Sequence, residues 1–327
     1  AETRLGPLFN TLYGTFDWAI EQSLELLAGG ERARSVEAAD MLRALVCDVS
    51  EGSVSLNLAE YYRRLAPLVF DFVAGEPLGI ETTRTTELLR FNTSTCGQKR
   101  FSMLGLFLCP ATREQACSAY DAAVGGSQIY TLDRFGVGAV PFDVVIPSVG
   151  RGTLRLGTRG GVVMTEEPVA FAFKRPVDTV ERLAEELEKK FGPDVVVIGK
   201  AVALLGMLAT EFVFVFHEGA SSYVPISRDF HRRLGAMAPR LNPILRIRYE
   251  PWDALSSCTA WLRLPEPLRR PFGAEEMSAE SFARRWRNVA DEQTQVLADL
   301  VRLRRPLELI EYLDRQEGGQ WSCLASE

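Results

Sequence analysis

The most apolar stretch of the chain covers residues 194–218, with the sequence DVVVIGKAVALLGMLATEFVFVFHE. Its pattern predicts a buried strand, a short helix and a second strand, over residues 195–198, 200–210 and 212–217. Two charged residues, Lys200 and Glu211, lie inside this stretch. Because a buried charge is costly unless it is paired, each of the two needs either a partner or a function.

A βαβ unit is predicted over residues 169–198. Asp178 is a candidate helix N-cap, Glu181 follows at the capping-box position, and Gly192 is a candidate C-cap. The apolar residues between these caps recur at helical spacing: Val180, Leu183, Leu187 and Phe191. Apolar, strand-like segments flank the helix on both sides. The unit is therefore expected to be a right-handed crossover between parallel strands.

Helical periodicity dominates both ends of the chain. Residues 1–77 are expected to form three helices. A long helix through Trp286 is expected to end before Pro306, and a further helical segment is expected over 307–314. Between these ends, a helix is expected over 111–124 and a surface connector over 265–273. A period of two predicts short strands over 80–83, 88–93, 101–109, 129–132, 142–146, 153–156, 161–164, 223–226, 244–249 and 260–264.

These elements predict an α+β fold with a mixed sheet that contains one βαβ unit, flanked by an N-terminal helical segment and by C-terminal helices. A chain of 327 residues is too long for one ordinary core. We expect three parts: a helical segment (1–77), a mixed α/β sheet domain (78–272), and C-terminal helices that pack on the sheet domain (273–327).

Composition narrows the class of protein. Hydrophobic residues make up 46% of the chain and charged residues 24%, which is typical of a globular protein. The net charge of −6 argues against a broad nucleic-acid-binding face. The six cysteines include no C-x-x-C motif, and the two histidines provide no zinc spacing, so no metal site is expected.

The location expected from the sequence is the cytoplasm. The chain opens without a signal-peptide pattern, and reduced thiols are the simplest interpretation of its cysteines. Residues 195–216 could span a bilayer by length, but Lys200 and Glu211 would each cost about 2.5–3.5 kcal/mol near its centre. A membrane-spanning segment is therefore not expected.

Lys200 is the first candidate functional residue, because it directly follows a buried strand, where α/β proteins often bind ligands. A neutral Lys200 could form a Schiff base, and a charged one could bind a carboxylate or a phosphate. The structural alternative is that its ammonium reaches water or a carbonyl. On one helix, Glu211 would lie about 16 Å from Lys200, so each residue needs a different partner.

Two further groups of residues could contribute chemistry. His217 could act as an acid or base, but Glu218 beside it should point to the opposite face of a strand. The polar loop STCGQKR places Cys96 beside Lys99 and Arg100, a setting that lowers a thiol pKa and could hold an anion. The simpler interpretation of His217 is a hydrogen-bonded residue at the end of a strand. The simpler interpretation of the STCGQKR loop is a basic turn exposed to solvent.

The leading hypothesis is a cytoplasmic enzyme or binding protein for a small anionic ligand. Its candidate catalytic residues are Lys200, His217 and Glu211, and its candidate ligand-binding residues are Cys96, Lys99, Arg100 and Glu218. No cofactor is indicated, catalysis itself stays open, and a homo-oligomer is compatible with the sequence. The alternative hypothesis is a non-catalytic interaction or assembly protein that uses its terminal helices as an interface.

Overall fold

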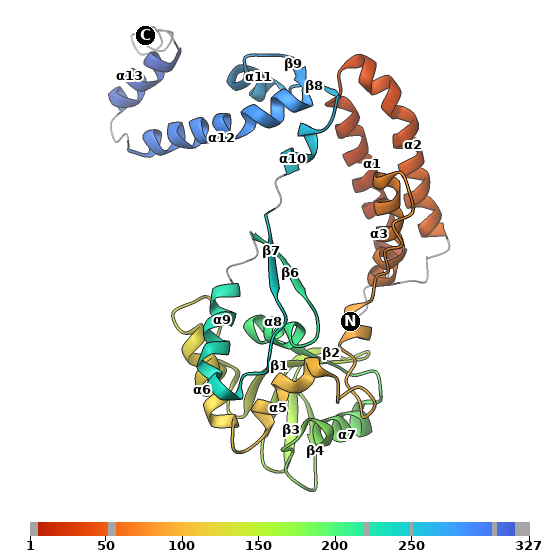
Figure 1. Ribbon diagram of the computed structural model, residues 1–327, viewed down its shortest axis with the longest axis vertical. Helices are drawn as coiled ribbons and strands as arrows, with labels where there is room; N and C mark the ends of the chain where they lie inside the picture. Colours follow the sequence, from red (N-terminus) through yellow and green to blue (C-terminus); the bar gives the residue numbers. More distant parts are fainter. Residues whose placement is uncertain (1–5, 52–56, 219–222, 249–250, 303–305, 318–327) are drawn as a thin grey trace. The chain divides into compact units, whose positions relative to one another are not determined.

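The computed structural model describes residues 6–51, 57–218, 223–248, 251–302 and 306–317 (Figure 1). The fold is α+β, as predicted. Its contacts divide the chain into two compact units: unit 1 contains Ala1–Thr11 and Leu45–Tyr249, and unit 2 contains Leu12–Ala44 and Glu250–Glu327. The boundaries of these two units differ from the domain boundaries near residues 77 and 272 that the sequence suggests. The division into three domains stays a prediction.

Unit 1 is built around a five-stranded sheet in the order β4-β3-β2-β1-β5. Every pair of neighbouring strands in it is antiparallel. The first four strands form a meander, and β5 lies beside β1 at the far edge. The strands are β1 (Ala139–Ile146), β2 (Gly150–Leu156), β3 (Gly160–Met164), β4 (Val169–Ala172) and β5 (Val196–Gly199).

The predicted βαβ unit is present as β4, helix α7 (Val180–Phe191) and β5. The two strands run in the same direction, because four successive antiparallel pairings separate them. They do not pair with each other, however, since they occupy opposite edges of the sheet. Helix α7 begins at the N-cap Thr179, one residue after the predicted cap Asp178, and ends at the predicted Gly192.

Among the residues that the structure describes, parallel strand pairing occurs in a separate two-stranded sheet. Strands β6 (Phe214–His217) and β7 (Ile244–Ile247) pair in parallel and are connected through helix α9 (Tyr223–Leu234). In unit 2, β8 (Trp261–Arg263) and β9 (Glu276–Ser278) form an antiparallel pair. Both kinds of pairing therefore occur, but in different sheets.

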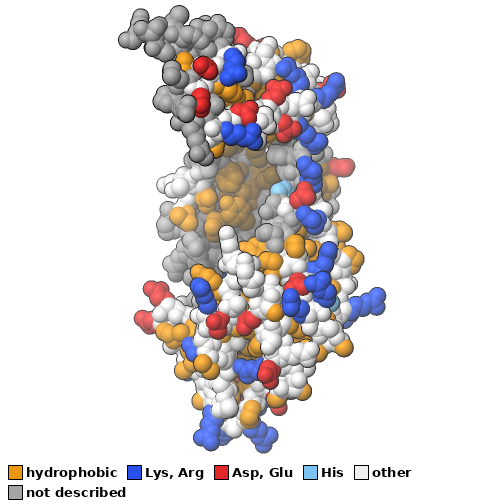
Figure 2. Space-filling model, turned by 90° about the vertical axis from the view of Figure 1, so that its left-hand side faces the viewer, with side chains coloured by type: hydrophobic (Ala, Val, Ile, Leu, Met, Phe, Trp, Pro, Cys, Tyr) orange, Lys and Arg blue, Asp and Glu red, His pale blue; other side chains and the backbone are white. Residues whose placement is uncertain are grey.

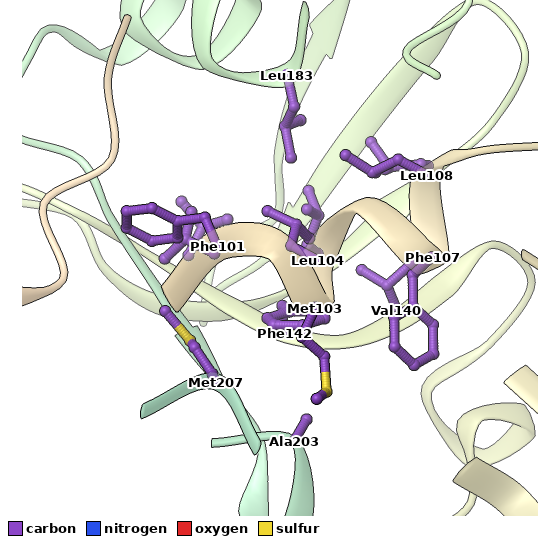
Figure 3. Close-up of a cluster of buried hydrophobic side chains, with 14 of the residues drawn as sticks. Phe101, Met103, Leu104, Phe107, Leu108, Val140, Phe142, Leu183, Ala203 and Met207 are labelled. Atoms are coloured by element: carbon purple, nitrogen blue, oxygen red, sulfur yellow. The ribbon is translucent and has the colours of Figure 1, made fainter. Parts of the chain in front are cut away.

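Helix α5 (Ser102–Leu108) lies in the middle of the core of unit 1 (Figure 3). The rings of Phe107 and Phe142 meet edge to face, with centroids 5.7 Å apart. The sequence predicted a strand over 101–109, which was wrong. Its buried residues, Met103, Leu104, Phe107 and Leu108, recur at the helical positions i, i+1, i+4 and i+5.

Other short segments also differ from the predicted strands. Residues 223–226 form the first turn of α9, and residues 129–132 lead into the 3-10 helix η3 (Leu132–Phe135). The region 80–93 contains the short helix α4 (Thr85–Leu88), turns and one isolated β-bridge, in which Arg90 pairs with Val196 of β5. The expected connector over 265–273 is largely helix α11 (Glu266–Phe272). Windows of four to six residues fit both periodicities, so tertiary packing decides between them.

The predicted helices α1 (Phe9–Glu25), α2 (Gly29–Glu51), α3 (Leu58–Ala74), α6 (Arg113–Val124), α8 (Ala201–Ala209), α12 (Ala279–Arg302) and α13 (Pro306–Glu317) are all present. The short helix α10 (Pro251–Ser256) adds to them. In unit 2, the turn between α1 and α2 extends the small sheet, because Ala28 N donates to Trp261 O at 2.9 Å. Most of α1 and α2 thus belongs to one compact unit with the C-terminal helices, whereas α3 belongs to unit 1.

Candidate anion-binding site

Helix α8 positions the two charged residues of the central apolar stretch. Lys200 precedes the helix as its N-cap, and Glu211 follows it. The two residues do not pair with each other. The Nζ atom of Lys200 lies 2.5 Å from Asp143 Oδ1, and Glu211 Oε2 accepts a hydrogen bond from the Arg100 amide at 3.2 Å. Glu211 also forms an ion pair with the Arg100 guanidinium, so an ion pair lies at each end of this apolar helix.

Sheet register brings Lys200 to Asp143. Asp143 pairs with Ile198 across the β1–β5 ladder, and Lys200 lies two positions beyond Ile198, so both side chains share one face of the sheet. The Lys200 amide continues the ladder by donating to Pro141 O at 2.8 Å. The Asp143 side chain is only 7% exposed, whereas that of Lys200 is 16% exposed.

Asp143 holds a second cation on its other oxygen. Arg151 Nε donates to Asp143 Oδ2 at 2.7 Å. Asp143 pairs with Thr153 of β2, and Arg151 lies two positions from Thr153, which places it on the same face. One carboxylate thus contacts two cations. The three side chains carry a net charge of +1, and the Arg151 side chain is 54% exposed.

An aromatic ring and a third cation lie beside this cluster. The ammonium of Lys200 lies over the Phe135 ring, 4.4 Å from its centroid, in a cation–π contact. Arg155, four positions after Arg151 on β2, donates from Nε to Val137 O at 3.1 Å. Its guanidinium crosses Gly136 so closely that a Cβ there would lie 2.9 Å from it. We call Lys200, Asp143, Arg151, Arg155 and Phe135 the Lys200 cluster.

The turn from β5 into α8 is tightly constrained. A Cβ on Gly199 would lie 2.5 Å from Leu204 N, so only glycine fits between the strand and the helix. Ala201 has a φ of 39°, a left-handed conformation that is strained for a residue with a side chain. The first amides of α8 lack partners within the helix and carry partial positive charge. This turn therefore brings the positive end of α8 next to Lys200.

The chemistry of the cluster is that of ion recognition. Both contacts of Lys200, with Asp143 and with the Phe135 ring, are contacts of the charged ammonium. Schiff-base formation requires the neutral amine, so the surroundings of Lys200 suit anion binding better than covalent catalysis. Asp143 accepts a hydrogen bond from the guanidinium of Arg151 and lies in ion-pair contact with the ammonium of Lys200. The exposed part of Arg151 can meet a ligand.

The second ionic group, at the other end of α8, pairs the buried Arg100 with the half-buried Glu211. Arg100 is 7% exposed, its guanidinium donates to Gln98 Oε1, and its Nε lies 3.6 Å from Glu211 Oε2. The guanidinium also lies 5.3 Å from the centroid of the Phe212 ring. Arg100 and Glu211 therefore neutralise each other's charge. The guanidinium of Arg100 is bound by protein groups and not directed at a ligand.

The Cys96 loop turns inward rather than forming a solvated tip. Asn92 organises it: Oδ1 accepts from the amides of Ser94 and Thr95, and Nδ2 donates to Pro193 O at 2.9 Å. Cys96 is 7% exposed. Burial raises the pKa of its thiol, and the nearby carboxylate of Glu181 adds to this rise. This direction is opposite to the one expected from the basic neighbours in the sequence.

Lys99, His217 and Glu218 stand apart from the Lys200 cluster. Lys99 is exposed, and its carbonyl accepts from Thr210 Oγ1 at 3.0 Å. His217 is an exposed residue of β6, opposite Ile247 of β7. Glu218 forms ion pairs with Arg246 at 3.4 Å and with Arg248 at 3.6 Å. The seven residues selected from the sequence thus do not form one site.

Sequence reasoning missed Asp143, Arg151, Arg155 and Phe135. A signal for Asp143 was present, because it interrupts the apolar strand sequence AVPFDVVI just as Lys200 interrupts the central stretch. Its pairing depends on two ladder registers, which one sequence does not reveal. The exposed Arg151 and the half-buried Arg155 carried no distinguishing pattern.

The described residues contain no group of three or more His, Cys, Asp or Glu that could hold a metal ion. None of the helices in the described ranges is both long and apolar enough to cross a membrane. The chain matches no protein-family model, no curated protein and no solved structure at a significant level. The site is therefore interpreted from its own geometry.

Proposed function

We propose that this protein binds a small anion, a carboxylate or a phosphate, at the Lys200 cluster. Lys200 and Arg151 contact the anion, Asp143 orients both cations, and the positive end of α8 adds to their attraction. The observation that carries the proposal is the contact of one buried carboxylate with two cations, at 2.5 Å and 2.7 Å. This arrangement leaves a net positive charge on the face of the sheet where the Arg151 side chain is exposed to solvent.

The physical basis of this proposal is that the carboxylate of the cluster is buried while one of its cations is exposed to solvent. A fully buried ion pair would be neutral and would have no need of a ligand. Here the inner carboxylate is almost fully buried, while the Arg151 side chain is 54% exposed. A guanidinium has five donors in a planar fork and binds carboxylate or phosphate in a bidentate manner. Arg151 uses Nε for Asp143, and its terminal nitrogens are suited to the ligand.

A thermal-shift screen tests this function. Inorganic phosphate, phosphorylated metabolites, keto acids and nucleotides would be compared on the wild type, on Arg151→Met and on Lys174→Met. Lys174 is an exposed lysine outside the cluster and serves as the matched control. A ligand at 100 times its dissociation constant adds about 2.7 kcal/mol of stability. The proposal requires a shift for one class of anion that Arg151→Met loses and Lys174→Met keeps.

The proposal includes a cytoplasmic location, no nucleic-acid partner, and compatibility with a homo-oligomer. In the view of Figure 2, Lys and Arg side chains are interspersed with Asp, Glu and hydrophobic ones over the described surface. Such a mixed surface suits a small ligand better than a long polyanion. The proposal assigns no reaction, because ion recognition alone accounts for the geometry of the cluster.

An interaction function through the terminal helices is the second candidate. Leu297 and Val301, one turn apart on α12, are 63% and 85% exposed. Such a pair on an amphipathic helix favours a helical interface. Light scattering on the wild type and on Leu297→Glu/Val301→Glu would test this candidate. A larger mass for the wild type, lost in the double variant, would support it, and identical monomer masses would contradict an interface between copies.

A further inference from the structure

Strand β4 ends the five-stranded sheet, and its pairing within the described residues is with β3 alone. The direction of its backbone groups follows from the register. Phe173 N donates to Arg159 O at 3.1 Å, which continues the register in which Phe171 pairs with Gly161. In an antiparallel ladder, alternate residues bond to the same neighbour. Ala170 and Ala172 therefore direct their N–H and C=O groups away from β3.

A groove runs along this edge. It has a volume of about 440 Å³, and its lining combines the edge strand with one side of α7: Ala170, Phe171, Ala172, Glu186, Lys189 and Lys190. In Figure 1, α7 lies next to the β3–β4 end of the sheet. The two alanines leave room beside the backbone, and the buried ring of Phe171 forms part of the apolar floor. A groove between an edge strand and a helix fits a chain in the extended conformation.

The charges along the groove favour an acidic occupant. Lys189 and Lys190 are both exposed on the last turn of α7. Glu186 also lines the groove, but Arg182 neutralises it, with Nη2 2.7 Å from Glu186 Oε1. The wall formed by α7 is therefore positive. The strand itself, with the sequence VAFA, carries no charged residue to oppose pairing with another chain.

We propose that this groove binds an extended acidic segment of a partner protein, which pairs with β4 as an added strand. The backbone groups of Ala170 and Ala172 bond to the segment, and its carboxylates meet Lys189 and Lys190. The proposal concerns a part of unit 1 other than the Lys200 cluster and holds whether or not the cluster binds a small anion.

The direct probe is a blocked heptapeptide in which valine and glutamate alternate, labelled with fluorescein and followed by anisotropy. Its counterpart carries lysine in place of each glutamate. The full-length protein is compared with Ala172→Pro, with Lys189→Glu/Lys190→Glu, and with the control Lys99→Glu, an exposed lysine outside the groove. Proline at 172 removes a donor that points away from β3, so the β3–β4 ladder keeps its bonds.

The expected result is saturable binding of the glutamate peptide, at least tenfold tighter than binding of the lysine peptide. Lys189→Glu/Lys190→Glu reverses this preference, Ala172→Pro weakens binding at least tenfold, and Lys99→Glu binds like the wild type. Equal melting temperatures for the unbound proteins would show that the variants are folded. The proposal is overturned if the wild type does not bind the glutamate peptide, or if the charge-reversed variant binds it equally well. A groove occupied by a second copy of the chain, seen as dissociation of a dimer by Ala172→Pro, would also overturn it.

Discussion

The Nζ atom of Lys200 lies 2.5 Å from Oδ1 of Asp143, and this contact joins two strands of the sheet to the start of α8. Arg151 contacts the other oxygen of the same carboxylate from β2. Asp143, on β1, is therefore the common partner of Arg151 on β2 and of Lys200, which directly follows β5. This makes it the residue on which the geometry of the proposed anion site depends.

The three charged residues should contribute unequally to stability. Asp143→Ala leaves the partly buried Lys200 without its carboxylate and is expected to cost about 3–5 kcal/mol. Lys200→Met leaves Asp143 with Arg151 and should cost about 1–3 kcal/mol. Arg151→Met removes an exposed partner and should cost less than about 1 kcal/mol. Urea unfolding measures all three.

The double variant Asp143→Ala/Lys200→Met is the control for that series. It removes both charges together, so it should be less destabilised than the sum of the two single changes by at least about 1 kcal/mol. Additive losses would mean that the ion pair contributes nothing beyond packing.

Glu211→Ala should destabilise the protein by about 2 kcal/mol, because Arg100 is then left buried with Gln98 as its remaining polar side-chain partner. Glu218→Ala is a suitable comparison, since the ion pairs of Glu218 are exposed and should contribute less than about 1 kcal/mol. Thermal unfolding of the two variants separates these cases. Equal losses would contradict an internal role for Glu211.

Cys96 should react slowly with iodoacetamide, at least tenfold more slowly than a free thiol, because burial raises its pKa and hinders access. The raised pKa also has a consequence for stability. The unfolded thiol ionises near pH 8.5 and the folded one at higher pH, so folding stability falls as pH rises above about 8.5. In Cys96→Ser this fall should be shallower. Rapid alkylation of Cys96 under native conditions would contradict the inward orientation of the loop.

Glu188 should contribute to the pH dependence of folding stability at acidic pH. The amide and hydroxyl of Thr93 lower its pKa by hydrogen bonding to the carboxylate. A lowered folded pKa gives stability that is present above the unfolded pKa, about 4.3, and is lost as pH falls through the folded value. Glu188→Gln should therefore have a lower melting temperature at pH 7 and a weaker decline between pH 5 and pH 3. Curves of melting temperature against pH that run parallel for the two proteins would refute this role.

The sequence predicted the elements whose side chains follow one period over several turns. Helix α7 is an example, because its stripe from Leu183 to Leu187 and its terminal Gly192 agree with each other. Helix α5 escaped prediction because Ser102–Leu108 is apolar on most of its surface, so both periodicities fit. Its helical form depends on packing against β1, α7 and α8, which lie far from it in the sequence.

The sequence predicted one member of the candidate site, Lys200, but not its partners. Lys200 was identified because a charge in an apolar run needs a partner, and the structure supplies one. The partner itself depends on the pairing of Asp143 with Ile198 and with Thr153, two long-range registers. A solvated turn was the simpler interpretation for Arg100 and Cys96, because the local bonds of Asn92 to Ser94 and Thr95 form a turn without showing which way it faces. Its inward orientation depends on long-range contacts, such as that of Asn92 with Pro193 O.

Isothermal titration of the wild type and of Arg151→Met tests the central claim most directly, with inorganic phosphate and with the anion that gives the largest thermal shift. Arg151 is exposed, so its loss should leave the fold intact. We predict binding of one anion per chain to the wild type, and a dissociation constant at least tenfold weaker in Arg151→Met, with Lys174→Met unchanged. Equal affinities for all three proteins, or heats of dilution alone for each of them, would contradict the assignment of the Lys200 cluster as an anion-binding site.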